Sequence, residues 1–261
     1  MGNRLAAAIG PDMSTLGIKR SLVRLGLIVL ASLGAASCGG GGAASPSGPS
    51  FDLAAGIASL SASTVNATMS VSGTYLSSNA TGSAQLTQSV ATAAMFGGGS
   101  ALMQTTTVSG MVMSNAGDFP LLYSFVQYDS SAYATLGLDI NISSVLQYAV
   151  ADSPIEFPSS VRAGDTAVLG TMTGYVDAAM TMGESTIQVS YVVIADPENT
   201  DSVIVEVIDK CFGFQGGGCT GQIFQFDYSL TAAGSMSLQS VSILYPTTAN
   251  IPADMLLFTV Q

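Results

Sequence analysis

Two of the three cysteines, Cys211 and Cys219, are close enough in sequence to form a disulfide. The segment between them, Phe-Gly-Phe-Gln-Gly-Gly-Gly, can reverse direction tightly because glycine adopts conformations that other residues avoid. In an oxidising compartment two such thiols are expected to be joined. A loop of this size stabilises a fold by about 2.5 kcal/mol in the chain-entropy model. Zinc binding is the alternative, but the chain offers it no histidine and no further nearby cysteine.

The complete absence of histidine removes most catalytic chemistry. Ser-His-Asp catalysis, Cys-His catalysis and the common zinc sites all need an imidazole. Carboxylates remain, and Glu156, Glu184 and Glu206 could serve glycoside hydrolysis if the fold brought two of them together. The chain has no Trp, however, on which sugars usually stack. We therefore expect neither an enzyme nor a bound cofactor, with a carboxylate-based hydrolase as the less favoured alternative.

One acidic segment is a weak candidate for a metal site. Asp196, Glu198 and Asp201 place oxygen ligands close together, and Ca²⁺ takes several such ligands at about 2.3 to 2.6 Å. Their spacing does not match the EF-hand loop. We expect a solvated hairpin tip here, so the sequence predicts no metal site.

The first part of the chain, residues 1–37, has the character of a secretory signal peptide. A basic segment at residues 19–24 precedes an apolar run from Leu25 to Ala36. A helix of that run would span roughly 18 Å, short of the roughly 30 Å hydrocarbon core of a bilayer, so a transmembrane anchor is the weaker interpretation. Met13 is the better candidate for the start, because a leader counted from it has an ordinary length.

The end of this leader, Leu33-Gly34-Ala35-Ala36-Ser37-Cys38, resembles a bacterial lipobox. The resemblance covers only the leader. It implies that Cys38 is lipidated and becomes the first residue after cleavage. Gly39 in the next position resembles lipoproteins sorted to the outer membrane, which implies a lipid-anchored protein on the periplasmic side or at the cell surface. The alternative is ordinary cleavage that leaves Cys38 as a free thiol.

The charge that follows Cys38 restricts the partners. Sixteen acidic residues stand against only Arg162 and Lys210, a net side-chain charge of −14. Such a chain cannot neutralise a run of phosphates, so nucleic acid and anionic lipid headgroups are poor partners. Membrane attachment is therefore expected through the lipid on Cys38.

The remaining sequence predicts a linker and one all-β domain. Residues 39–50 contain only Gly, Ala, Ser and Pro, which is typical of a flexible linker. Residues 51–261 show apolar side chains alternating with Ser, Thr, Asn and Gln at a period of two, which indicates β-strands.

Two hairpins carry the clearest strand pattern. The first pairs residues 187–193 with 203–207 around a turn at 196–201, and the second pairs 224–230 with 236–245. In the last of these strands the apolar set changes from even to odd positions, which predicts a β-bulge near Gln239 or Ser240. Weaker strand patterns occupy residues 68–76, 84–90, 102–113 and 121–128.

Two short helices are also expected. Leu53, Ile57 and Leu60 lie at helical spacing behind Asp52, a favourable N-cap. A second set behind Asn141 shows the same spacing: Ile142, Val145, Leu146 and Ala149.

These patterns predict roughly ten to twelve antiparallel strands in a β-sandwich or a curved sheet resembling half a barrel. An outer-membrane barrel is less favoured, because it needs lipid-facing apolar positions throughout and aromatic girdles. The expected function is a non-catalytic, lipid-anchored envelope protein with a binding or structural role. The alternative is a carrier that shelters an apolar ligand or lipid in its curved sheet.

Overall fold

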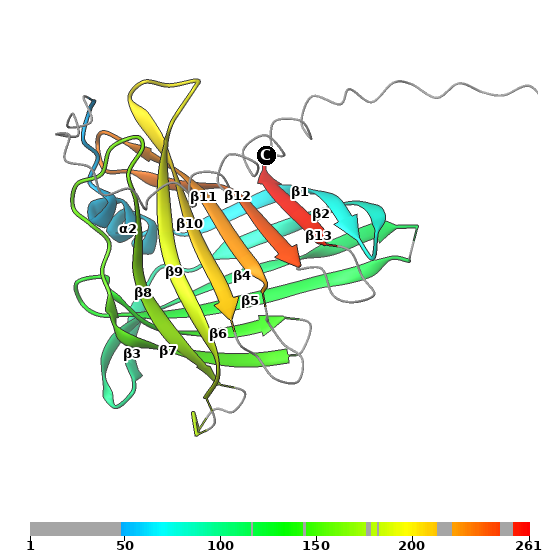
Figure 1. Ribbon diagram of the computed structural model, residues 1–261, viewed down its shortest axis with the longest axis horizontal. Helices are drawn as coiled ribbons and strands as arrows, with labels where there is room; N and C mark the ends of the chain where they lie inside the picture. The colour runs from blue at the N-terminus through cyan, green and yellow to red at the C-terminus, as the bar shows by residue number, and fades with distance from the viewer. Residues whose placement is uncertain are drawn as a thin grey trace, which may run out of the picture. The chain divides into compact units, whose positions relative to one another are not determined.

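The computed structural model describes residues 48–115, 117–142, 145–175, 179–181, 183–212, 221–245 and 253–261. The predicted leader, Cys38 and most of the predicted linker therefore lie outside the described residues. One helix and thirteen strands follow one another along the chain (Figure 1). They are α2 (Leu53–Ser61), β1 (Val65–Tyr75), β2 (Ser78–Gln88), β3 (Thr92–Phe96), β4 (Gly99–Ser114), β5 (Phe119–Asp129), β6 (Thr135–Ile142), β7 (Val145–Ile155), β8 (Thr166–Tyr175), β9 (Gly183–Ala195), β10 (Ser202–Phe212), β11 (Ile223–Thr231), β12 (Met236–Tyr245) and β13 (Asp254–Val260).

The sheet closes on itself as an antiparallel barrel. From β4 to β13 each strand pairs with its neighbour in the chain, and β13 then pairs with β1, with Met69 opposite Val260. β1 pairs with β2, and β2 pairs with β4, with Ala80 opposite Ser114. Twelve strands thus form the ring, and β3 is an additional strand on β4.

The expected all-β class is confirmed, but the architecture is more specific than predicted. The prediction named a sandwich or half-barrel of roughly ten to twelve strands, and the structure has a closed twelve-stranded barrel with one extra strand. Closure removes both edges of the ring, which would otherwise present unpaired backbone N–H and C=O groups.

β4 is long enough to pair with two strands, β2 and β3, along the same edge. Residues 106–114 of β4 pair with β2, and residues 99–103 pair with β3. The β3–β4 turn uses Gly97 and Gly98, both at positive φ. Phe96, at the end of β3, stacks on Tyr128 with ring centroids 4.6 Å apart. Gly137 leaves room for that ring, since a Cβ there would lie 2.2 Å from the Phe96 side chain.

Both predicted hairpins are confirmed, as β9–β10 and β11–β12. The predicted bulge is confirmed as well. Asp227 pairs with Ser240 and Tyr228 pairs with Leu238, so Gln239 is the extra residue in β12. The bulge keeps the apolar side chains on one face, because Leu238 and Val241 both line the barrel interior.

The first predicted helix is confirmed and the second is wrong. In α2 the Asp52 carboxylate accepts a hydrogen bond of 2.8 Å from the Ala55 amide, which is the expected N-cap. Ile142 instead ends β6 and residues 145–149 lie in β7, where Leu146 pairs with Asn141 of β6. Sequence spacing alone could not distinguish the two, because a short apolar run fits either period and pairing with β6 and β8 decides it.

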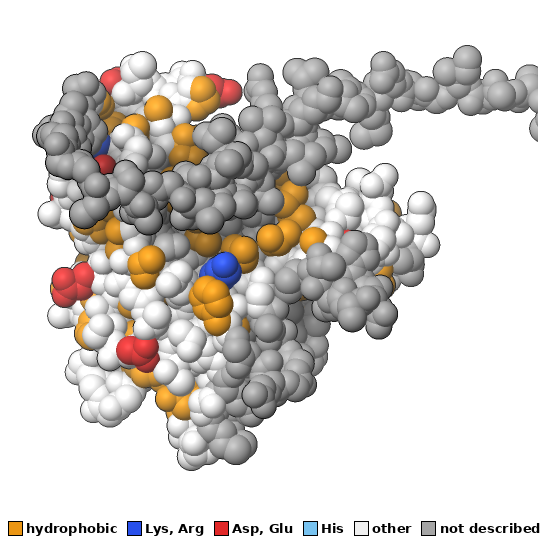
Figure 2. All heavy atoms as spheres, viewed as in Figure 1, with side chains coloured by type: hydrophobic (Ala, Val, Ile, Leu, Met, Phe, Trp, Pro, Cys, Tyr) orange, Lys and Arg blue, Asp and Glu red, His pale blue; other side chains and the backbone are white. Residues whose placement is uncertain are grey.

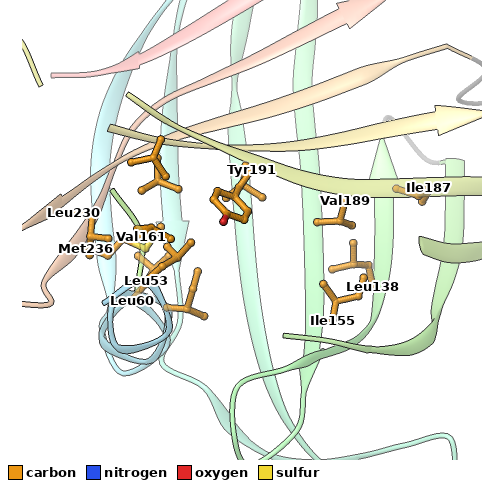
Figure 3. Close-up of a cluster of buried hydrophobic side chains, with 14 of the residues drawn as sticks. Leu53, Leu60, Leu138, Ile155, Val161, Ile187, Val189, Tyr191, Leu230 and Met236 are labelled. Carbon is orange, nitrogen blue, oxygen red and sulfur yellow. The ribbon is translucent and has the colours of Figure 1, made fainter. Parts of the chain in front are cut away.

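The apolar side chains of Leu53, Ile57 and Leu60 on α2 belong to the barrel core. A twelve-stranded ring is wider than the roughly eight-stranded size that side chains alone can fill, so part of its interior needs another occupant. Figure 3 shows Leu53 and Leu60 on the helix beside Leu230, Met236 and Val161. Two buried clusters fill much of the interior, one from α2 and β6–β12, the other mainly from β1, β2, β4, β5 and β11–β13. Within the described residues no helix is both long and apolar enough to cross a membrane.

Candidate functional site in the barrel interior

A cavity lies between the two buried clusters. The cavity has a volume of about 120 Å³, which is several times the volume that one water molecule requires. Its wall comes from both clusters and from α2: Ile57 and Leu60 on the helix, Leu86 and Val108 on one side, Val189 and Val207 on the other. The wall is therefore chiefly apolar. Cavities of this kind, with a few polar groups, are the usual form of small-molecule sites.

Aromatic rings reach across the interior beside this cavity. Phe125 on β5 contacts Phe224 and Phe226 on β11 edge-to-face, with centroids 6.0 and 6.1 Å apart. β5 and β11 are six steps apart in the ring, so these contacts join opposite walls. Edge-to-face pairs add about 0.5–1.5 kcal/mol each beyond the apolar area they bury. They hold the barrel at a fixed width here.

Glutamine side chains fix the end of α2 inside the barrel. Gln88 Nε2 donates to the Leu60 carbonyl at 3.1 Å, and Gln104 Nε2 donates to the Ser89 carbonyl at 2.9 Å. The last carbonyls of a helix lack partners within the helix, and the Leu60 carbonyl accepts from both the Ser63 amide and the Gln88 side chain. Both glutamines are buried and line the cavity. Their amides are already engaged with backbone.

A second polar group at the cavity wall is also internally bonded. Gln127 Nε2 donates to both carboxylate oxygens of Asp129, at 2.9 and 3.1 Å. Burial raises the pKa of Asp129, against the opposing effect of its hydrogen bonds from Gln127 and Thr135. Tyr123, also on β5, and Tyr245 on β12 share a hydrogen bond of 3.3 Å between their hydroxyls. Burial, and then the neighbouring Tyr245, raise the pKa of Tyr123, which stays neutral.

Asp209 is the exception among these polar groups. It lies on β10 opposite Phe224 and Val189, on the same face as Val205 and Val207, and it lines the cavity. Its carboxyl makes no hydrogen bond within the described part of the chain. Burial raises the pKa of Asp209 to about 7. The partly accessible Asp209 side chain lines this cavity and a smaller adjoining pocket.

The predicted cysteine sites are only partly described. Cys211 is buried at the end of β10 and is disulfide-bonded. Cys219 lies outside the described residues, so its pairing with Cys211 stays a prediction. Cys38 also lies outside them.

The acidic segment forms the predicted hairpin tip between β9 and β10. Asp196 Oδ1 accepts the Glu198 amide at 2.9 Å, and Asp196 Oδ2 accepts the Ser202 hydroxyl at 2.6 Å. The Asp201 amide donates to Asn199 Oδ1 at 3.0 Å. These bonds shape the turn. Across the described residues no group of His, Cys, Asp and Glu could hold a metal ion.

The three candidate glutamates do not meet. Glu156 is exposed after β7, three strands from Glu206 on β10, or about 14 Å at the usual strand spacing. Glu206 pairs with Val192, eight residues along β9 from Glu184, which corresponds to roughly 26 Å. Retaining and inverting glycosidases need carboxyl groups about 5 to 9.5 Å apart.

Sequence reasoning missed Asp209, although a signal for it exists. Val203, Val205 and Val207 mark one face of the strand, and Asp209 continues the same odd-numbered series. A carboxylate in phase with a buried apolar face is unusual and points to a functional position. The glutamines of the wall carry no such signal, because their positions become internal only when the ring closes.

The outer face has a different character. On β2 the exposed side chains Thr81, Ser83, Gln85 and Thr87 alternate with buried Ala84 and Leu86. On the face in Figure 2 acidic and apolar side chains are scattered among uncharged polar ones.

Comparison with family models, with curated proteins and with solved structures finds no match for the chain.

Proposed function

We propose that this protein is a non-catalytic binding protein that holds a small apolar molecule inside its barrel. The observation that carries the proposal is the chiefly apolar cavity in the interior of the closed ring. A buried void of this size lacks partner atoms along its wall and therefore costs stability when empty. An apolar ligand would restore those contacts.

The polarity of the two faces supports an enclosed ligand. A barrel that spans a bilayer turns its apolar side chains outward and keeps a polar interior. On β1 and β2 the opposite holds, since Met69, Val71 and Leu86 are buried while Thr68 and Ser83 are exposed.

For the placement of the protein we propose a lipid anchor at Cys38 in the cell envelope, with the barrel tethered by residues 39–50. The support is the resemblance of the leader to a lipobox and the scarcity of basic residues that could bind headgroups. Loss of membrane association in a Cys38→Ala chain tests this placement.

The binding function is tested with two adjacent threonines of β4. Thr106 lines the cavity, whereas Thr107 lies on the opposite face of the same strand. We expect Thr106→Phe to fill the cavity and to weaken binding of a fluorescent apolar dye at least ten-fold. Thr107→Phe should bind the dye as the unchanged protein does. Titration of the full chain in detergent-free buffer provides the measurement.

Organic extraction of protein purified from its own cells, followed by mass spectrometry, gives an independent readout. The proposal predicts a stoichiometric apolar compound in the unchanged protein and in Thr107→Phe, and its depletion in Thr106→Phe. Equal dye affinity in the two variants, or no dye binding at all, would contradict the proposed function.

A further inference from the structure

We propose that the Asp209 carboxyl is the polar anchor of the cavity and selects an apolar ligand ending in a hydrogen-bond donor, an alcohol or an amine, over one ending in a carboxylate or phosphate. This inference rests on the proposed function, because it names the ligand class of the same cavity.

The first support is the position of Asp209 in the wall. Its neighbours across the strands are Phe224 and Val189, and its neighbours along the same face of β10 are Val207 and Cys211. Asp209 also lines a smaller adjoining pocket with Phe125, Leu138 and Ile140. A polar group buried among apolar ones without a hydrogen bond costs about 1–3 kcal/mol. A ligand that donates to this carboxyl would remove that cost.

The second support is that the amide donors of the cavity wall are engaged, although the Tyr228 hydroxyl, which also lines the cavity, makes no hydrogen bond among the described residues. Gln88 and Gln104 donate to backbone carbonyls, and Gln127 donates to Asp129. Asp209, in contrast, has no hydrogen-bond partner among the described residues. The cavity therefore offers a ligand one free acceptor of high strength.

The third support is charge. After Cys38 the chain has only Arg162 and Lys210 as basic residues, and neither lines the cavity. Lys210 is exposed on the opposite face of β10 from Asp209, with its Nζ 5.0 Å from the centre of the Phe212 ring. An anionic headgroup would thus meet a carboxylate and no compensating cation, which is strongly unfavourable in an apolar site.

Tyr228 on β11 also lines the cavity and interacts electrostatically with Asp209. Burial is the main cause that raises the pKa of Tyr228, so its hydroxyl stays neutral below pH 10. Above pH 7 the Asp209 carboxyl is largely ionised, since its pKa is about 7, and it then acts only as an acceptor. Selection for a donor should accordingly be strongest above pH 7.

The test uses three ligands of equal chain length: decan-1-ol, decylamine and decanoate. Each is titrated at pH 8 against the full chain in detergent-free buffer, with displacement of a bound apolar dye as the signal. We expect the alcohol and the amine to bind at least ten-fold more tightly than decanoate. Asp209→Asn keeps the shape and removes the negative charge, and it should reduce the preference for amine over decanoate to less than three-fold. Asp209→Leu should weaken binding of both donors about ten-fold.

The outcomes separate the inference from the proposed function. If all three ligands bind the unchanged protein equally, or if Asp209→Asn leaves the amine preference intact, the anchor is wrong while the binding function stands. If none of the three displaces the dye, the assignment of the ligand class is also wrong. If the dye itself does not bind, the proposed function fails first. Circular dichroism of both variants establishes that each is folded.

Discussion

Asp209 is a destabilising residue in the unliganded barrel, because ionising a carboxyl in an apolar wall is costly. Burial raises its pKa to about 7, above the ordinary value of about 3.9 that it has in an unfolded chain. Asp209 therefore binds its proton more tightly in the folded state. Its contribution to stability is fully present below about pH 4 and is lost as the pH rises through 7.

The upward shift of the pKa of Asp209 determines how the unfolding free energy depends on pH. Between pH 4.5 and pH 8 the unchanged protein should lose roughly 2–4 kcal/mol of unfolding free energy through Asp209. In Asp209→Asn that loss should be absent, so the variant should be the more stable protein at pH 8. Urea unfolding followed by circular dichroism at both pH values measures the difference. The other buried carboxyls with raised pKa, such as Asp129, are present in both proteins and cancel.

An identical pH dependence in Asp209→Asn and the unchanged protein would show that Asp209 remains solvated. Comparison at pH 4.5, where Asp209 is protonated in the folded protein, provides the internal control, because the two folded proteins then carry the same charge at this position.

At the scale of elements, α2 acts as an internal plug whose fit depends on Gly56. A Cβ at this position would lie 2.7 Å from Leu230 Cδ1 and 3.2 Å from Met236 Sδ, and both of those side chains are buried. The small residue lets the helix approach β11 and β12 closely. Glycine is otherwise a poor choice in a helix, costing up to about 1 kcal/mol relative to alanine.

A larger side chain at position 56 should displace α2 from Leu230 and Met236. We expect Gly56→Val to lower the unfolding free energy by about 1–3 kcal/mol through overpacking. It should also accelerate amide hydrogen exchange in α2. The matched control is Ala55→Val, one residue away on the exposed side of the helix, with an expected cost of about 0.5 kcal/mol from helix propensity. Equal effects of the two substitutions would mean that α2 is not packed as a plug.

Local elements were predictable from the sequence wherever one pattern dominated. The period-two alternation of Ile187 to Val193 predicted β9, and the change of phase in β12 predicted the bulge at Gln239. Residues 142–149 were misassigned because helical and strand periods coincide over so short a run. Closure was not predictable, since the β2–β4 pair skips a strand and the β1–β13 pair joins distant segments without any local signature. The cavity could not be foreseen either, because it exists only once the ring has closed.

β13 is as important for closing the ring as any central strand. It pairs with β1 on one side and β12 on the other, and Leu256 and Phe258 are almost fully buried. Without β13 the edges of β1 and β12 would be unpaired and the interior would be open. Open edges beside exposed apolar surface promote aggregation.

Deleting residues 254–261 should therefore yield aggregated or oligomeric chains, as judged by light scattering and size-exclusion chromatography. Deleting residues 93–102 removes most of β3 and the part of β4 beside it, but leaves the β2–β4 pairing from Thr106 to Ser114 intact. That variant should remain monomeric, although it also loses Phe96 and its ring contact with Tyr128. A monomeric, cooperatively unfolding chain without β13 would argue against closure of the barrel.

The pairing of β1 with β13 also governs when folding can finish. Met69 of β1 pairs with Val260 of β13, so the contacts that close the ring have a large separation in sequence. Loop-closure entropy makes such contacts slow to form. For a chain exported as we propose, this delay is useful, because a ring that cannot close before β13 is available keeps the preceding strands unfolded and able to pass through a narrow translocation channel.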